Sequence, residues 1–406
     1  MSAKSRKASP SAASFSSLLS SKEIVIFCGS GGVGKTSVAA AAGAQAAAEI
    51  GGNVLVLTVD PARRLATALG LEGIGNVERE VPASVFKEAG IEPRGKLFAA
   101  MLDTKRSWDD LVHRYAPDEE TAYQILDNPL YVNITGRFVN AHEYIAMERL
   151  YEIHESGKYD LIIVDTPPTR SAIDFLEAPK RLGEFFGGRF LKLLTLPYRA
   201  GGRVGAAAID IAARPFYRIA DRILGSDFMR QLGEFFLNFQ TMNDGFVKRA
   251  QEVDRLLRDR RTSFCVVTTL ESVPLHEAEF FCNKLDDYGF TLGAIALNRV
   301  LPAYFHDTDA RAVAESLADP ASFVAKLHDE FPDLFDDRAQ AATVLSSVGE
   351  NYHNFSIVAQ REAEQRRRLS EGAAGAIPDV VVDVPQMADD ISDLAGLLGI
   401  GAALFS

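Results

Sequence analysis

The chain has 406 residues and a formal net charge of −12, with 47% hydrophobic and 24% charged residues. These values predict a well-packed soluble protein with one large domain or two smaller ones, and the acidic balance argues against a general nucleic-acid binder. The three cysteines, Cys28, Cys265 and Cys282, form no Cys-x-x-Cys pair. That spacing argues against a zinc clasp or a disulfide framework and favours reduced thiols in the cytoplasm.

Residues 1–22 are expected to form a disordered tail. Eight of the first twenty residues are serines, three are basic and none is acidic. The segment lacks the apolar stretch of a signal peptide, although a transit peptide would share its composition. No run of about 18 apolar residues follows anywhere in the chain, so we expect no membrane span and at most peripheral membrane contact.

Strand-like apolar runs recur along the chain, with helical patterns between them. The runs are 24–28, 54–59, 97–102, 161–164, 264–268, 294–297 and 380–384, and the helical patterns include 38–50, 140–156, 276–288 and 351–369. This alternation predicts an α/β fold with a doubly wound, mostly parallel sheet over residues 23–398, followed by a short tail at 399–406. Ligands bind such sheets at the carboxyl ends of the strands.

A glycine-rich loop follows the first of these runs. Its spacing Gly29-x-x-x-x-Gly34-Lys35-Thr36, between a strand and an Ala-rich helix, is that of a P-loop. In such a loop the backbone N–H groups and the helix N-terminus face phosphate oxygens. Lys35 is expected to reach the β- and γ-phosphates, and the Thr36 hydroxyl to ligate Mg²⁺. Related loops carry a second lysine at the position of Ser30.

Aspartates end two further apolar runs. Asp165 follows a run that begins with Tyr-Asp, which is typical of a Walker B acid that holds Mg²⁺ through a water molecule. Asp60 then remains to orient the attacking water or to accept its proton. The alternative is that each aspartate simply caps the helix that follows it.

The strand rhythm stops between about residues 179 and 250, which predicts a helical insertion at 180–250. This span holds twelve basic and six acidic side chains and nine of the 25 phenylalanines. It is expected to form a groove for an apolar helix or another protein client. Two alternatives remain, namely a helical core with basic outer faces, and membrane-surface contact through Phe185, Phe186 and Phe190.

Four motifs in this order resemble the ArsA family of arsenite-pump and tail-anchored-protein-targeting ATPases, a deviant-Walker group of P-loop NTPases. They are Gly-Gly-Val-Gly-Lys-Thr at 31–36, Asp-Pro-Ala at 60–62, Asp-Thr-Pro-Pro-Thr at 165–169 and Leu-Asn-Arg-Val at 297–300. The resemblance extends from about residue 23 to residue 398 and includes a Val-Pro-Gln-Met turn at 384–387.

The resemblance implies ATP and Mg²⁺ as cofactors and ATP hydrolysis as the activity. It implies that Asp60 and Lys35 are catalytic, with Asp60 in a first switch loop, and that residues 166–169 form a second switch. It places Asn298 on the adenine edge, with the 385–387 turn beside the base. The implied metal site consists of Thr36, Asp60 and Asp165. The implied nucleotide contacts are Gly29, Ser30, Gly31, Gly32, Val33, Gly34, Lys35, Thr36, Ser37, Asn298, Arg299, Pro385 and Met387.

Two departures from the family pattern bear on activity. Ser30 replaces the lysine that, in the family, reaches across a dimer to the partner's phosphates, and Arg170 stands where glycine is usual. Arg170 is either a replacement cation or a solvated side chain. The predicted function is therefore an ATPase whose homodimer, or heterodimer with a paralogous ATPase, closes around nucleotide and acts on a client at 180–250. The alternatives are a non-catalytic nucleotide-binding subunit that needs such a paralogue, and a ParA- or MinD-like positioning ATPase.

Overall fold

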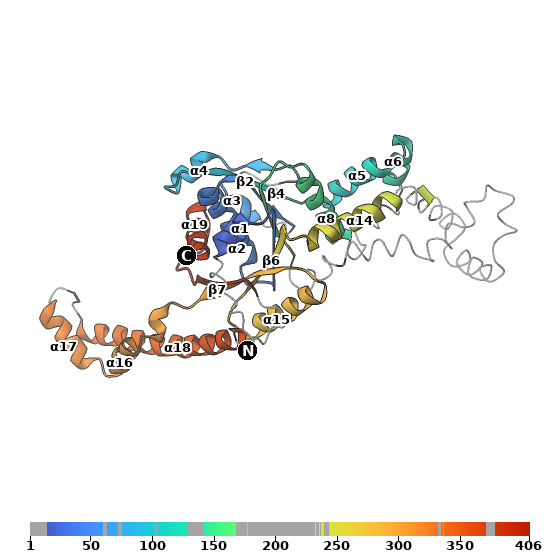
Figure 1. Cartoon of the computed structure of the whole chain (residues 1–406). Coiled ribbons are helices and arrows are strands. Elements are labelled where there is room, and N and C mark those ends of the chain that lie inside the picture. Colours follow the sequence, from blue (N-terminus) through green and yellow to red (C-terminus); the bar gives the residue numbers. More distant parts are fainter. Residues whose placement is uncertain are drawn as a thin grey trace, which may run out of the picture.

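A single sheet runs through the centre of the protein (Figure 1). A computed structural model of the chain describes residues 14–59, 63–71, 75–102, 104–128, 131, 141–167, 177, 232, 235, 237–238, 243–331, 334–335, 337–370 and 378–406. Within these residues, eight strands take the order β3-β4-β2-β5-β1-β6-β7-β8. The strands are β1 (Ile24–Gly29), β2 (Gly52–Thr58), β3 (Arg79–Glu80), β4 (Gly95–Met101), β5 (Leu161–Asp165), β6 (Thr262–Thr268), β7 (Leu292–Val300) and β8 (Val380–Pro385).

This sheet confirms the predicted doubly wound α/β fold. All seven apolar runs form strands, and these seven pair in parallel. The central strands are buried on both faces, which explains why their sequences are continuously apolar rather than alternating. The short strand β3 was not expected. It pairs antiparallel with β4 at one edge, and both of its residues are exposed, so it carries no apolar pattern.

Helices cover both faces of the sheet, and each face has its own hydrophobic core. One core is formed with α5 (Thr104–Tyr115), α8 (Ala141–Glu155), α14 (Asn243–Arg258) and α15 (Ser272–Asp287), and α6 (Glu119–Leu126) packs beside α5. The other is formed with α1 (Phe15–Ser20), α2 (Lys35–Gln45) and its continuation η1 (Ala46–Ile50), α3 (Arg63–Ala68), α4 (Ala83–Glu88) and α19 (Leu394–Phe405). No helix in the described part of the chain has the length and apolar character needed to cross a membrane.

The expected tails at both ends are wrong within the described residues. Helix α1 lies in the segment expected to be disordered, and Phe15 is buried against Phe27 and Phe405, with ring centroids 6.5 and 6.2 Å apart. Helix α19 runs through the expected tail at 399–406 and buries Leu404. The serine-rich composition concealed an apolar face at spacing i, i+3, i+4, which buries α1 against the core. Residues 1–13 lie outside the described residues.

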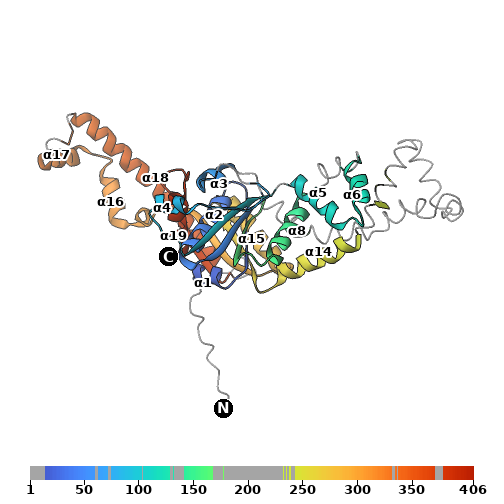
Figure 2. The same ribbon diagram turned by 90° about the horizontal axis from the view of Figure 1, so that it is seen from above.

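Two parts of the chain extend away from the sheet in opposite directions (Figures 1 and 2). Helices α5, α6, α8 and α14 extend on one side. On the other lies an arm that consists of η3 (Ala303–His306), α16 (Thr308–Ser316), α17 (Ala321–Glu330) and the 33-residue α18 (Arg338–Ser370). The predicted insertion at 180–250 lies largely outside the described residues, and its expected end at 250 falls inside α14.

Candidate phosphate-binding site

The glycine-rich loop lies at the carboxyl end of β1, in the middle of the sheet, and leads directly into α2. Gly32 and Gly34 both have φ of +85°, a left-handed conformation that glycine adopts without strain. A Cβ atom on Gly29 would lie 2.3 Å from the carbonyl oxygen of Val267 on β6. The loop geometry thus requires glycine for two separate reasons, backbone conformation at Gly32 and Gly34 and close packing at Gly29.

Asp165 is the centre of a buried polar cluster beside the loop. Its carboxylate is fully buried at the end of β5. Lys35 Nζ lies 2.5 Å from Asp165 Oδ1, and the Thr36 hydroxyl donates to Oδ2 at 2.7 Å. Thr58, at the end of β2, also donates its hydroxyl to Oδ2 at 3.0 Å. A carboxylate that accepts from three side chains in this way is held in one orientation.

The cluster is continuous with the first residue after β5. Lys35 Nζ also donates to the carbonyl oxygen of Thr166. The backbone N–H and the hydroxyl of Thr166 in turn donate to the carbonyl oxygen of Phe27 on β1, at 3.2 and 2.9 Å. Lys35 therefore connects the start of α2 to the start of the segment expected to be the second switch.

Thr58 is a member of this cluster that sequence reasoning missed. A threonine in a strand is an ordinary β-branched residue, so the residue type carries no signal. The sheet register reveals it, because Thr58 on β2 is the direct neighbour of Asp165 on β5. The available sequence signal was its position, as the polar residue within the apolar run 54–59, two residues before Asp60.

Asn298 approaches the loop from the opposite side. Its side-chain amide donates to the carbonyl oxygen of Val33 at 2.7 Å, and Nδ2 would lie 2.3 Å from a Cβ atom on Gly34. The structure thus brings Asn298 to the loop, while its expected contact with adenine remains a prediction.

A distortion in β7 explains how Asn298 turns inward. The β7–β8 register shifts between Leu297 and Val300, and within it Arg299 has φ of +59°, which is uncommon for a residue other than glycine. Asn298 is buried and Arg299 exposed. Strained conformations of this kind concentrate at functional sites. Pro385 pairs with Val300 in the register, and Met387 packs against the core on the α2 face.

Ser30 is nearly buried, with 9% of its surface exposed, and its hydroxyl has no hydrogen-bond partner among the described residues. Beneath the loop, burial raises the pKa of the Cys28 thiol to about 12, so it is un-ionised at neutral pH. The expected site residue Asp60, together with Thr169 and Arg170, lies outside the described residues.

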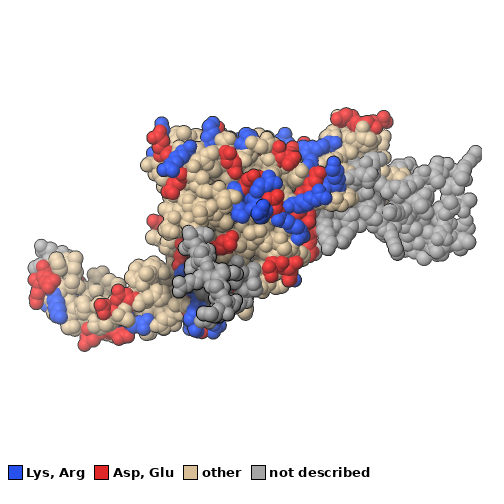
Figure 3. Space-filling view, viewed as in Figure 1, with Lys and Arg blue, Asp and Glu red and all other residues tan. Residues whose placement is uncertain are grey.

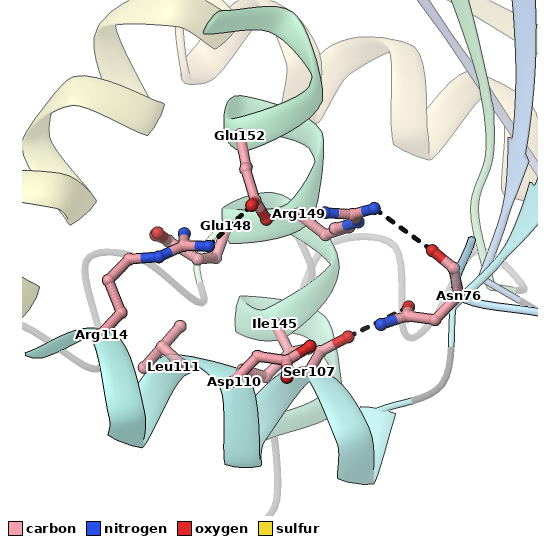
Figure 4. A pocket seen from close by; sticks show the side chains of 9 residues that line it. All are labelled: Asn76, Ser107, Asp110, Leu111, Arg114, Ile145, Glu148, Arg149 and Glu152. Atoms are coloured by element: carbon pink, nitrogen blue, oxygen red, sulfur yellow. Dashed lines mark hydrogen bonds and ion pairs between the residues drawn. The ribbon is translucent and has the colours of Figure 1, made fainter. Parts of the chain in front are cut away.

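A second polar hollow lies between α5 and α8, away from the loop (Figure 4). Arg149 pairs with Glu78 at 2.7 Å and with Glu152 at 2.8 Å, and Arg114 pairs with Glu152 at 2.6 Å. Because both guanidinium groups already contact carboxylates, the hollow offers little net charge to a ligand. Its ion pairs join the two helices to the segment that precedes β3.

Comparison with known proteins finds sequence similarity to one family of ATPases. The sequence model of the anion-transporting ATPase family matches residues 22–343. The chain is 25% identical to a putative arsenical pump-driving ATPase 2 of Aquifex aeolicus over 77% of this chain and 90% of that protein. It is 25% identical to the ATPase GET3 of Lachancea thermotolerans over 76% and 80% of the two chains. It is also 30% identical to a putative arsenical pump-driving ATPase of Halobacterium salinarum, over 80% of this chain but 45% of that protein.

Proposed function

Since the chain belongs to the anion-transporting ATPase family, we propose that it binds ATP at residues 29–37 and hydrolyses it with Mg²⁺. One observation carries this proposal. The buried residues Asp165 and Lys35 form a cluster with the half-buried Thr36 at the carboxyl end of a parallel sheet, beside a loop whose Gly32 and Gly34 have left-handed backbone conformations.

ATP binding changes the partner of Lys35. In the structure its ammonium group is satisfied by Asp165 and by the carbonyl oxygen of Thr166. Phosphate oxygens placed in the loop are stronger acceptors for the same group, because each carries negative charge. Lys35 then moves its hydrogen bonds to the β- and γ-phosphates and releases the carbonyl oxygen of Thr166.

The residues beside the loop fit a magnesium ion. Mg²⁺ prefers oxygen ligands, and the side-chain atoms that meet there are all oxygens, namely Thr36 Oγ1, Asp165 Oδ2 and Thr58 Oγ1. Thr36 and Asp165 would hold the ion, Asp165 through a water molecule, and Thr58 keeps the carboxylate oriented. When bound, the ion neutralises charge that develops on the phosphate oxygens.

Hydrolysis requires a water molecule in a defined orientation, and we propose that Asp60 orients it. It follows Thr58 by two residues, and the hydroxyl of Thr58 is 3.0 Å from Asp165, so the end of β2 lies beside the phosphate site. Asp60 aligns the water for in-line attack on the γ-phosphorus and accepts its proton as the bond to the β-phosphate oxygen breaks. Lys35 stabilises the negative charge in the transition state.

The hydrolytic cycle acts on a client through the second switch. Release of the Thr166 carbonyl oxygen by Lys35 removes one of the contacts that hold the start of residues 166–169, the chain segment that precedes the insertion at 180–250. We propose that closure of a dimer around ATP reshapes the insertion and that an apolar helix or protein client binds there. A heterodimer with a paralogous ATPase is an equal candidate, because the buried Ser30 hydroxyl supplies no positive charge.

Titration with ATP and measurement of phosphate release test the proposal. Lys35→Ala is expected to weaken ATP binding about 10- to 100-fold, the loss of hydrogen bonds to a charged group. Asp60→Asn is expected to keep ATP affinity and to lose turnover. The matched control is Lys284→Ala, which removes a surface cation on α15 that pairs with Asp287. This variant is expected to leave ATP affinity and turnover unchanged.

Two outcomes separate the candidates. Turnover by the purified chain alone supports the enzyme, whereas binding without turnover, with turnover restored by a paralogous ATPase, supports the non-catalytic subunit. Unchanged ATP affinity in Lys35→Ala contradicts both.

A further inference from the structure

The arm carries an unusual concentration of exposed apolar side chains. Of the fifteen large hydrophobic residues that are exposed in the described part of the chain, nine lie between Tyr304 and Val358. Exposed apolar side chains are ordinary when they are scattered, but a contiguous set marks a binding surface. Figure 3 shows stretches of uncharged surface on the arm between its acidic groups.

Five residues of α18 define the apolar stripe: Val344, Val348, Asn351, Phe355 and Val358. Their spacing is four, three, four and three residues, which keeps them on one side of a helix with 3.6 residues per turn. The four apolar members are 43–56% exposed, and Asn351 is exposed as well.

The stripe is distinct from the side of α18 that packs within the arm. That side carries Gly349, Ser356 and Ala359, all buried, and a Cβ atom on Gly349 would lie 2.7 Å from the carbonyl oxygen of Ala314 on α16. A rotation of about 100° per residue places this packed side roughly a quarter-turn from the stripe. Within the described residues, the arm's own packing therefore leaves most of the stripe exposed, and only Phe355 contacts the arm, through Phe305.

The helix that bears the stripe is already formed and anchored. Phe305 packs against both Tyr352 and Phe355, and the end of α18 forms an ion pair between Arg366 and Asp383 on β8. The arm extends away from the sheet in both views, so a large partner can approach it (Figures 1 and 2). Binding along the stripe does not require the helix to be ordered first, which removes a large entropic cost.

We propose that the stripe pairs with the same stripe of a second copy of this chain, as two antiparallel helices related by a two-fold axis at Asn351. The stripe is nearly palindromic about that residue. An antiparallel pair places Val344 opposite Val358 of the second copy and Val348 next to its Phe355. A two-fold interface needs a surface that complements itself in this way.

Asn351 favours this occupant over an apolar helix from another protein. An asparagine at the centre of an apolar contact needs a hydrogen-bond partner, and an apolar client offers none. On the two-fold axis the two amides face each other, and each donates to the carbonyl oxygen of the other. The flanking residues Ser347 and Asn354 are uncharged, so a second copy meets no repulsion there. The proposal does not depend on nucleotide or on the proposed ATPase activity.

Cross-linking tests the register of this pairing. The three native cysteines are all buried, so a maleimide does not reach them readily. Asn351→Cys places a new thiol at an exposed position. Treatment with a short bismaleimide, without nucleotide, is expected to convert this variant to a covalent dimer. The control is Ile357→Cys, on the same helix but on a different side and 37% exposed, which is expected to give no covalent dimer. Equal yields for the two variants, or no dimer with Asn351→Cys, overturn the proposal.

The mass in solution gives a second, independent measurement. The wild-type chain without nucleotide is expected to be dimeric by light scattering at tens of micromolar. Val344→Asp and Val348→Asp are expected to raise the dimer dissociation constant at least tenfold, whereas Ile357→Asp leaves it unchanged. A monomeric wild-type chain, or a dimer that both stripe variants retain, overturns the proposal. Failure of ATP binding would leave every one of these results unaffected.

Discussion

The loop end of the sheet buries polar side chains, whereas the arm exposes apolar ones. At the loop end, charged and polar groups such as Lys35, Asp165 and Thr58 are buried, and each has a partner within the chain. On the arm, large apolar side chains such as Val344 and Val348 are exposed on one side of α18. Burial of a polar group is tolerable only with a partner, and exposure of a contiguous apolar surface indicates a partner elsewhere. The loop end is thus largely complete within one chain, and the arm is not.

Of the substitutions proposed at the loop end, removal of the Asp165 carboxylate is expected to destabilise it most. Asp165→Ala leaves the buried ammonium group of Lys35 without its charged partner, which is expected to lower the free energy of unfolding by about 3–5 kcal/mol. Urea denaturation measures this change. The double variant Lys35→Met/Asp165→Leu removes both charges and is expected to recover at least half of the loss.

That double variant distinguishes the pair from its surroundings. If the double variant is as unstable as the sum of the single changes, the ion pair is not the source of the effect. The destabilisation would then come from the loss of side-chain packing at the end of β5.

The close approach of two strands at the loop gives a smaller effect. Gly29→Ala places a Cβ atom 2.3 Å from the carbonyl oxygen of Val267, so β1 and β6 have to separate locally. The expected loss is about 1–3 kcal/mol, which is typical of an overpacked core. Gly31→Ala is the matched control, because nothing lies within 4 Å of its Cβ position and the chain is exposed there. Its expected change is within about 0.5 kcal/mol, and an equal loss in both variants would contradict the packing argument.

The sequence predicted which residues meet at the loop end, because these residue types follow a fixed spacing. Lys35 and Thr36 belong to one motif, and Asp165 ends an apolar run, so the parallel sheet brings them to the same edge. Thr58 could not be found in this way, since its role depends on the register between β2 and β5, which no local pattern records. Asn298 was predicted only through the family resemblance.

The sequence predicted the arm and the chain ends less well. The predicted helix at 351–369 covers only the second part of α18, because small residues such as Ala, Ser and Gly dominate the part that precedes residue 351. Helix α1 was missed because serines surround its three buried residues, Phe15, Leu18 and Leu19. In both cases the element is fixed by tertiary packing rather than by local composition.

A substitution in the stripe is expected to have the smallest effect on the stability of the folded chain. If the stripe is unpartnered within the chain, then Val348→Asp removes no intramolecular contact of the core and exchanges one moderate helix former for another. At low protein concentration its free energy of unfolding is therefore expected to lie within about 0.5 kcal/mol of the wild-type value.

Protein concentration makes that measurement specific to pairing. Dimerisation stabilises the folded chain by mass action, so the thermal midpoint of the wild-type chain is expected to rise with protein concentration, whereas that of Val348→Asp stays constant. A loss of more than about 2 kcal/mol in Val348→Asp at low concentration would have the opposite meaning, since a surface change that only prevents pairing is worth far less. Val348 would then be part of the chain's own packing, and the arm would be as complete within one chain as the loop end.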